Sequence, residues 1–64
     1  MSKIVFQRNY ETLEAYRVNG PDMVMVAIIW VGNADSVNVT FEDRTPARWF
    51  PSITAARHWI KDNR

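Results

Sequence analysis

The segment Met23-Val24-Met25-Val26-Ala27-Ile28-Ile29-Trp30-Val31 decides the fold class, because the segments on either side of it are patterned to pair with it or cover it. It is uncharged, rich in β-branched residues and bounded by turn signals, which predicts a buried strand. With 9 residues it is too short for a membrane span, which needs about 20.

Turn signals flank this strand on both sides. Asn19-Gly20-Pro21-Asp22 precedes it, and the Asn-Gly pair readily takes the positive φ that a tight reversal needs. Residues 32–36, Gly-Asn-Ala-Asp-Ser, follow it as a second reversal. Val37 to Glu42 then alternates apolar and polar residues, as a strand with one buried face does. We therefore expect a hairpin of these two strands.

The N-terminal third allows two interpretations. Ile4 to Gln7 and Leu13 to Val18 can form two strands that end at the first turn. Alternatively, Asn9 can cap a helix through Tyr16 or Arg17, with Glu11 near its positive end. We prefer the strands. Asp43 to Arg48 contains Pro46 and is expected to be a loop, followed by a short extended piece at Ala47 to Phe50.

The C-terminal segment predicts an amphipathic helix. Ser52 stands where an N-cap belongs, and Ile53 to Asn63 contains no helix breaker. At 100° per residue one side carries Ile53, Ala55, Ala56, Trp59 and Ile60, and the other carries Thr54, Arg57, His58, Lys61, Asp62 and Arg64. The predicted fold is thus α+β, an antiparallel sheet of three to four strands packed on one C-terminal amphipathic helix, in a single domain of residues 1–64.

The central strand raises a question of coverage, since simple alternation gives it two apolar faces. One face holds Met23, Met25, Ala27, Ile29 and Val31, and the other holds Val24, Val26, Ile28 and Trp30. One helix covers one face only. The second face is covered either by Trp49, Phe50 or the N-terminal segment, or by a second copy or a partner protein.

Composition narrows the class of protein. The 64 residues are 47% hydrophobic and 23% charged, as in globular domains, and they contain no cysteine. No disulfide or thiolate metal site is therefore possible, and so small a chain relies on packing or a partner. Residues 1–8 hold no apolar stretch of signal-peptide length, so we expect a cytoplasmic location without membrane attachment.

Charge gives an alternative hypothesis. The net charge is only +1, yet residues 44–64 hold five basic residues and one acid, and residues 1–43 hold three basic residues and six acids. Arg57, Lys61 and Arg64 lie at i, i+4 and i+7 of the predicted helix, and we call them the basic stripe. With Arg44 and Arg48 they form a candidate nucleic-acid-binding footprint. The competing explanation is an ordinary solvated helix face.

Residues for catalysis or cofactor binding do not form a recognisable set. His58 is the only histidine, so a metal site lacks ligands, and adjacent strand residues Glu42 and Asp43 point to opposite sides. The serines lack an oriented base, and the two glycines form no phosphate loop. We expect no enzymatic activity, no cofactor and no small-molecule substrate. Trp49 beside Arg48 is instead a candidate binding anchor.

Residues 48–60, Arg-Trp-Phe-Pro-Ser-Ile-Thr-Ala-Ala-Arg-His-Trp-Ile, resemble the strand-to-helix step of arm-type DNA-binding domains in phage tyrosine recombinases. They also resemble small phage-encoded accessory proteins, including anti-CRISPR inhibitors. The likeness covers about a fifth of the chain. The recombinase comparison implies a basic sheet face that reads DNA, whereas the strand from Met23 to Val31 is apolar, which favours the accessory-protein comparison.

The leading hypothesis is a non-enzymatic protein-interaction module, acting on a partner or on a second copy. Its candidate contact residues are Arg48, Trp49, Val24, Val26, Ile28 and Trp30. The alternative is a nucleic-acid-binding module that uses Arg44, Arg48 and the basic stripe.

Overall fold

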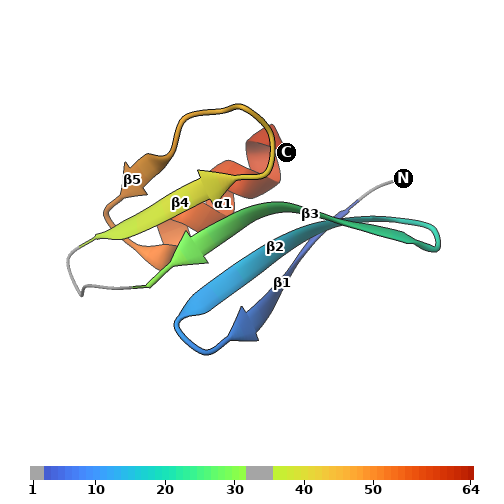
Figure 1. The fold of residues 1–64 in the computed structure, drawn as a ribbon, viewed down its shortest axis with the longest axis horizontal. Helices are drawn as coiled ribbons and strands as arrows, with labels where there is room; N and C mark the ends of the chain where they lie inside the picture. Colours follow the sequence, from blue (N-terminus) through green and yellow to red (C-terminus); the bar gives the residue numbers. More distant parts are fainter. Residues whose placement is uncertain (1–2, 32–35) are drawn as a thin grey trace.

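Five antiparallel strands form one sheet, in which each strand pairs with the one before it in sequence (Figure 1). The computed structural model describes residues 3–31 and 36–64. Its elements are β1 (Lys3–Asn9), β2 (Thr12–Asn19), β3 (Asp22–Trp30), β4 (Val37–Phe41), β5 (Arg48–Phe50) and α1 (Ile53–Asn63). The predicted α+β class, with an antiparallel sheet and a C-terminal helix, is confirmed. The predicted strand number of three to four is too low, because Arg48–Phe50 adds a fifth strand.

The N-terminal third forms strands, as preferred, and not the alternative helix. β1 and β2 pair without interruption from Lys3 opposite Val18 to Asn9 opposite Thr12. The turn between them places Tyr10 at a φ of 55°. A helix that begins at residue 9 does not form, because the paired strands are more stable. They gain a full set of ladder hydrogen bonds, and one of their faces is covered.

The turn between β2 and β3 forms at the predicted position. Asn19 lies opposite Asp22, which leaves Gly20 and Pro21 as the two loop residues. Gly20 has a φ of 62°, a conformation that glycine adopts without steric cost. The other predicted reversal, residues 32–36, lies outside the described residues except for Ser36. β3 and β4 on either side of it pair antiparallel, as expected for the hairpin.

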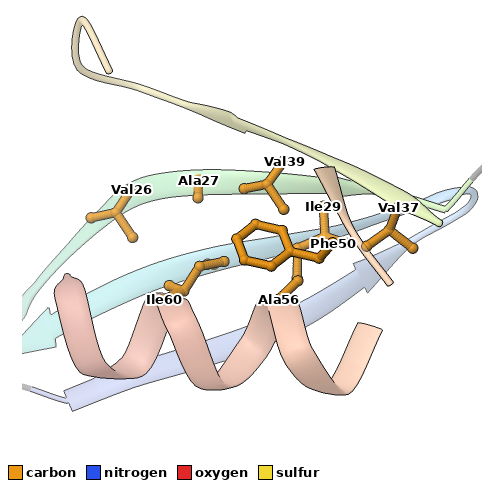
Figure 2. Close-up of a cluster of buried hydrophobic side chains, with 9 residues drawn as sticks. Val26, Ala27, Ile29, Val37, Val39, Phe50, Ala56 and Ile60 are labelled. Atoms are coloured by element: carbon orange, nitrogen blue, oxygen red, sulfur yellow. The ribbon is translucent and has the colours of Figure 1, made fainter. Parts of the chain in front are cut away.

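Helix α1 covers one face of the sheet and supplies the second layer (Figure 2). It begins after Ser52, whose side-chain oxygen accepts a hydrogen bond from the backbone N–H of Ala55 at 3.1 Å. This is the predicted N-cap. Ala56 and Ile60 are buried against the sheet, and Trp59 is half-buried beside them. The predicted core side of the helix is therefore correct.

The core lies between α1 and the sheet. Its buried members are Ala15, Val26, Ala27, Ile29, Val37, Val39, Phe50, Ala56 and Ile60. Six of them are fully inaccessible to solvent, namely the alanines Ala15, Ala27 and Ala56 and the larger Ile29, Val39 and Ile60. Small and branched side chains from both layers thus pack together and exclude water from the space between helix and sheet.

A β-bulge in β3 changes which side chains face the helix. Ala15 lies opposite Ala27 and Tyr16 lies opposite Met25, so Val26 is the extra residue. Val26 and Ala27 both point toward α1 as a result (Figure 2). The prediction of strict alternation along this strand is therefore wrong on the N-terminal side of the bulge.

Candidate functional site

The side of the sheet opposite α1 carries the candidate site. We call it the open face; its central residues are Thr12, Glu14, Tyr16, Met25, Ile28, Trp30, Asn38, Thr40 and Trp49, which follow from the strand registers. Helix α1 lies on the other side (Figure 1), and none of the described residues forms a layer over the open face. The suggestion that Phe50 or the N-terminal segment covers it is wrong: Phe50 is buried beneath α1, and β1 extends the sheet sideways.

Two tryptophans lie in one row across the open face. Trp30 on β3 lies opposite Asn38 on β4, and Asn38 lies opposite Trp49 on β5. Directly opposite residues in an antiparallel ladder share a face and have Cβ atoms about 5 Å apart. The two tryptophans therefore lie on either side of Asn38, with 47% of Trp30 and 66% of Trp49 exposed. Such exposure of two tryptophans is a large apolar surface without a partner in the described chain.

Hydrogen bonds orient several side chains of the open face. The Trp30 indole N–H donates to the Thr40 hydroxyl oxygen at 3.0 Å, which holds the ring along β4. The Tyr16 hydroxyl donates to a carboxylate oxygen of Glu14 at 2.9 Å. That hydrogen bond, with smaller contributions from burial and from the Glu14 charge, raises the pKa of Tyr16 above its ordinary value. The side chains of Trp30 and Tyr16 are thus held in place, which lowers the entropy cost of binding for these two groups.

The open face carries little charge. Glu14 is the one acid among its central residues, and its oxygens already accept from Tyr16 and Asn9. No arginine or lysine belongs to that central set. Aromatic and methionine side chains with few charges are typical of the centre of protein–protein interfaces.

The predicted contact residues do not all lie on this face. Ile28 and Trp30 do, but the bulge places Val26 on the helix side. Val24 lies opposite Arg17, whose guanidinium donates to the Arg64 carbonyl at the end of α1, so Val24 also faces that side. The sequence carries no direct signal for this bulge, because every β3 residue from Met23 to Ile29 is apolar.

Arg48 and Trp49 face opposite sides of β5 and do not form a joint anchor, contrary to expectation. The Arg48 guanidinium carbon lies 4.8 Å from the centre of the Trp59 ring and 5.4 Å from that of Phe50. Arg48 therefore packs over the edge of the core by cation–π contacts, and Trp49 alone projects from the open face.

The basic stripe is divided by the fold. Arg57 and Lys61 lie over the Phe6 ring of β1, at 5.0 and 6.0 Å from its centre. Arg64 turns the other way. Its guanidinium lies 4.7 Å from the Phe41 ring and 5.4 Å from the Trp59 ring, and its side chain is only 19% exposed. The expectation that Arg64 lies on the solvent side with Arg57 and Lys61 is therefore wrong.

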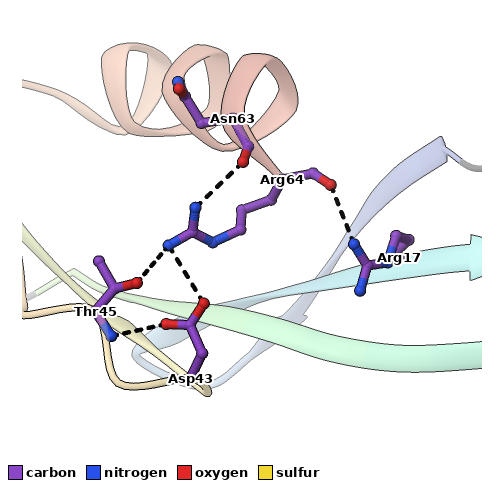
Figure 3. A network of polar contacts seen from close by, with 5 residues as sticks. All are labelled: Arg17, Asp43, Thr45, Asn63 and Arg64. Atoms are coloured by element: carbon purple, nitrogen blue, oxygen red, sulfur yellow. Dashed lines mark hydrogen bonds and ion pairs between the residues drawn. The ribbon is translucent and has the colours of Figure 1, made fainter.

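Arg64 instead connects the helix end to the loop after β4 (Figure 3). It donates to the Thr45 hydroxyl at 2.8 Å and forms an ion pair of 3.5 Å with Asp43. The Thr45 backbone N–H donates to Asp43 at 2.8 Å. Hydrogen bonds from Thr45, and to a lesser extent the Arg64 charge, lower the pKa of Asp43 below its ordinary value. Local sequence patterns do not reveal this network, because Thr45 and Asp43 lie 19 or more residues before Arg64 in the chain.

The remaining residues considered as metal ligands or binding groups do not come together in one site. Across residues 3–31 and 36–64, no three His, Cys, Asp or Glu side chains are grouped as a metal site would require. His58 and Arg44 are exposed on α1 and on the loop after β4. Within the same ranges, no helix has the length and apolar character that crossing a bilayer demands.

Comparisons with known proteins add no relative. No protein-family model matches the chain, and neither a curated protein nor a solved structure matches it.

Proposed function

We propose that this chain is a non-enzymatic binding module whose open face docks on another protein, with Trp30 and Trp49 as its anchors. The observation that carries the proposal is the row Trp30–Asn38–Trp49, in which two exposed tryptophans lie on either side of Asn38 on a sheet face that the helix does not cover. Tryptophan is the residue type most enriched among binding hot spots.

The chemistry of the face favours a protein partner with an apolar recess. Nucleic acids and anionic membranes attract surfaces rich in lysine and arginine, which the centre of the open face lacks. The broad dimensions of the molecule are 36 and 23 Å. A sheet face of this extent is comparable with the ~800 Å² per partner that stable protein interfaces bury.

The resemblance of residues 48–60 to small phage-encoded accessory proteins supports one version of this proposal. Trp49 lies within that stretch and projects from the open face. In this version the module is an inhibitor that blocks its partner by covering a functional surface.

Nucleic-acid binding is the weaker alternative. Of its five proposed residues, Arg48 packs over Trp59 and Arg64 is engaged with Thr45 and Asp43. Arg57 and Lys61 remain together on α1, and Arg44 is exposed on the loop after β4. Titration with DNA and RNA at two salt concentrations tests this alternative, which requires binding that weakens steeply as salt rises.

Site-specific photo-crosslinking in the native host cell tests the main proposal. A benzophenone amino acid replaces Trp49 on the open face in one variant, and Asp62 on the exposed side of α1 in the control. We expect a covalent adduct of defined mass with another protein from position 49 only. Adding Trp30→Ala to the position-49 variant should remove that adduct.

Three outcomes contradict the proposal. Adducts from position 62 but not 49 place the binding surface on the helix. Adducts from position 49 that persist with Trp30→Ala show that the tryptophan row is not the anchor. Crosslinks only between two copies of the chain, together with a dimer in sedimentation, show that a second copy occupies the face.

A further inference from the structure

Strand β1 forms an exposed edge of the sheet that is suited to pairing with another strand. It has seven residues and no proline, and its pairing with β2 shows no bulge. Among the described residues no strand lies on its outer side. The other edge, β5, has only three residues and is followed by Pro51. Long regular edges present unpaired backbone N–H and C=O groups that accept a further strand.

Cationic side chains lie along the helix side of this edge. Arg57 and Lys61 of α1 extend over Phe6, in the middle of β1. Ile4, also on the helix side of β1, lines a hollow of about 320 Å³ together with Lys61 and Arg64; Lys3 borders this hollow too, although its register places its side chain on the same side as Val5. A smaller hollow of about 130 Å³ is lined by Thr54, Arg57, His58 and Lys61. Side chains of a segment bound at this edge can therefore enter either hollow and lie next to the positive charge of Lys61.

These cations are not neutralised by ion pairs within the described chain. The ion pair found there joins Arg64 to Asp43, at the other side of the helix end. Arg57 and Lys61 form no ion pair with a described carboxylate. The edge therefore combines unpaired backbone groups with a positive flank.

We infer that β1 binds an extended acidic segment of a partner protein as a sixth strand. Successive side chains of a strand alternate between the two faces. Acidic residues at every second position then meet Arg57 and Lys61, and the intervening residues lie beside Val5 on the open face. Main-chain hydrogen bonds supply affinity and the alternate side chains supply specificity, as in other cases of strand addition.

Charge and geometry favour an acidic peptide at the β1 edge over a second copy of this chain and over a nucleic acid. Antiparallel pairing of two β1 strands centred on Phe6 brings the Arg57 and Lys61 side chains of both copies together, which costs energy through like-charge repulsion. A nucleic acid can meet the cations, but its backbone cannot continue the hydrogen-bond ladder of a sheet. An acidic extended peptide satisfies both features.

The test uses a capped heptapeptide of alternating valine and glutamate, and a second one of alternating valine and lysine. Amide resonances of the full chain are followed by NMR during titration, together with hydrogen exchange. We expect the glutamate peptide to shift the resonances of residues 3–9 and to slow their exchange, and the lysine peptide to do neither. Lys61→Glu should weaken glutamate-peptide binding about tenfold, whereas Arg44→Glu, the same charge change on the loop after β4, should leave it within twofold.

Trp49→Ala should also leave this binding unchanged, which separates the edge site from the open face. The inference is overturned by equal binding of the two peptides, or by shifts confined to residues outside β1. It is also overturned if decathymidylate shifts the Arg57 and Lys61 resonances and the glutamate peptide does not, because the flank is then a phosphate-binding surface. A dimer of the chain that forms through β1 at micromolar concentration also overturns the inference, because a second copy then occupies the edge.

Discussion

Trp30 and Trp49 lie on the same face of the sheet, one strand apart, with Asn38 directly between them. Their exposure contrasts with that of Trp59, which lies within 6.0 Å of Phe41 and Phe50, ring centre to ring centre, and below Arg48. The three tryptophans thus divide into one that holds the helix to the sheet and two that contribute surface.

This division predicts different effects on stability. Trp59→Ala removes the centre of the aromatic cluster and should cost about 3–5 kcal/mol, comparable with the whole stability of a domain this small. Trp49→Ala should change the free energy of unfolding by less than about 0.5 kcal/mol, because the side chain is mostly exposed. Urea denaturation followed by circular dichroism measures both. A folded Trp59→Ala variant with wild-type stability contradicts this account of the core.

The helix start depends on Ser52. Its side chain accepts a hydrogen bond from the Ala55 N–H, so Ser52→Ala should lower the free energy of unfolding by about 1 kcal/mol. Ser52→Asp should retain most of the stability, since aspartate is an equally good N-cap and carries a favourable charge there. Thermal denaturation compares the two, with about 4–8 °C expected per kcal/mol. Equal melting temperatures for wild type and Ser52→Ala would show that the cap does not matter.

The turn between β1 and β2 stores backbone strain at Tyr10. Its φ is 55°, and its side chain is 91% exposed, so the ring contributes little packing. Tyr10→Gly should therefore raise the free energy of unfolding by up to about 1 kcal/mol, whereas Tyr10→Val should lower it by a similar amount. The order Gly above Tyr above Val in denaturation midpoints checks the prediction. A valine variant as stable as the glycine variant would contradict the positive φ.

Stability should fall in acid through Asp43. Its carboxyl has a pKa below the ordinary value of 3.8, because Thr45 and Arg64 favour the ionised form in the folded state. At a pH between the folded and the unfolded pKa of Asp43, the unfolded chain binds more protons than the folded chain. The stabilisation by the Asp43 carboxylate is therefore fully present above pH 3.8, and it is lost as the pH falls through the folded pKa. Asp43→Asn should be less stable at pH 7, and the difference should shrink below pH 4. A difference that stays constant down to pH 2 contradicts this linkage.

Much of the fold could be predicted from local patterns. The Asn-Gly-Pro-Asp turn, the alternation from Val37 and the N-cap at Ser52 each specify structure within a few residues. The sequence predicts Arg48–Phe50 only as part of a short extended piece, because three residues carry too little periodicity to show strand pairing. This segment becomes a strand because it pairs with β4.

The candidate site was harder to predict, because its composition depends on nonlocal contacts. An apolar run identifies Ile28 and Trp30, the position beside Arg48 identifies Trp49, and all three lie on the open face. Val24 and Val26 were assigned to the wrong side, since an apolar segment gives no signal of a bulge. Arg64 was placed in the basic stripe because helical spacing alone cannot show that Thr45 and Asp43 meet it.

Whether the open face binds a partner through its tryptophan row is measured by the affinity of tryptophan variants for the crosslinked partner. Trp30→Ala and Trp49→Ala should each raise Kd about 30-fold or more while remaining folded, as expected for hot-spot residues worth about 2 kcal/mol. Tyr10→Ala, which truncates an even more exposed aromatic in the turn between β1 and β2, is the control and should stay within about twofold of wild type. Changes below threefold in both tryptophan variants would contradict the claim.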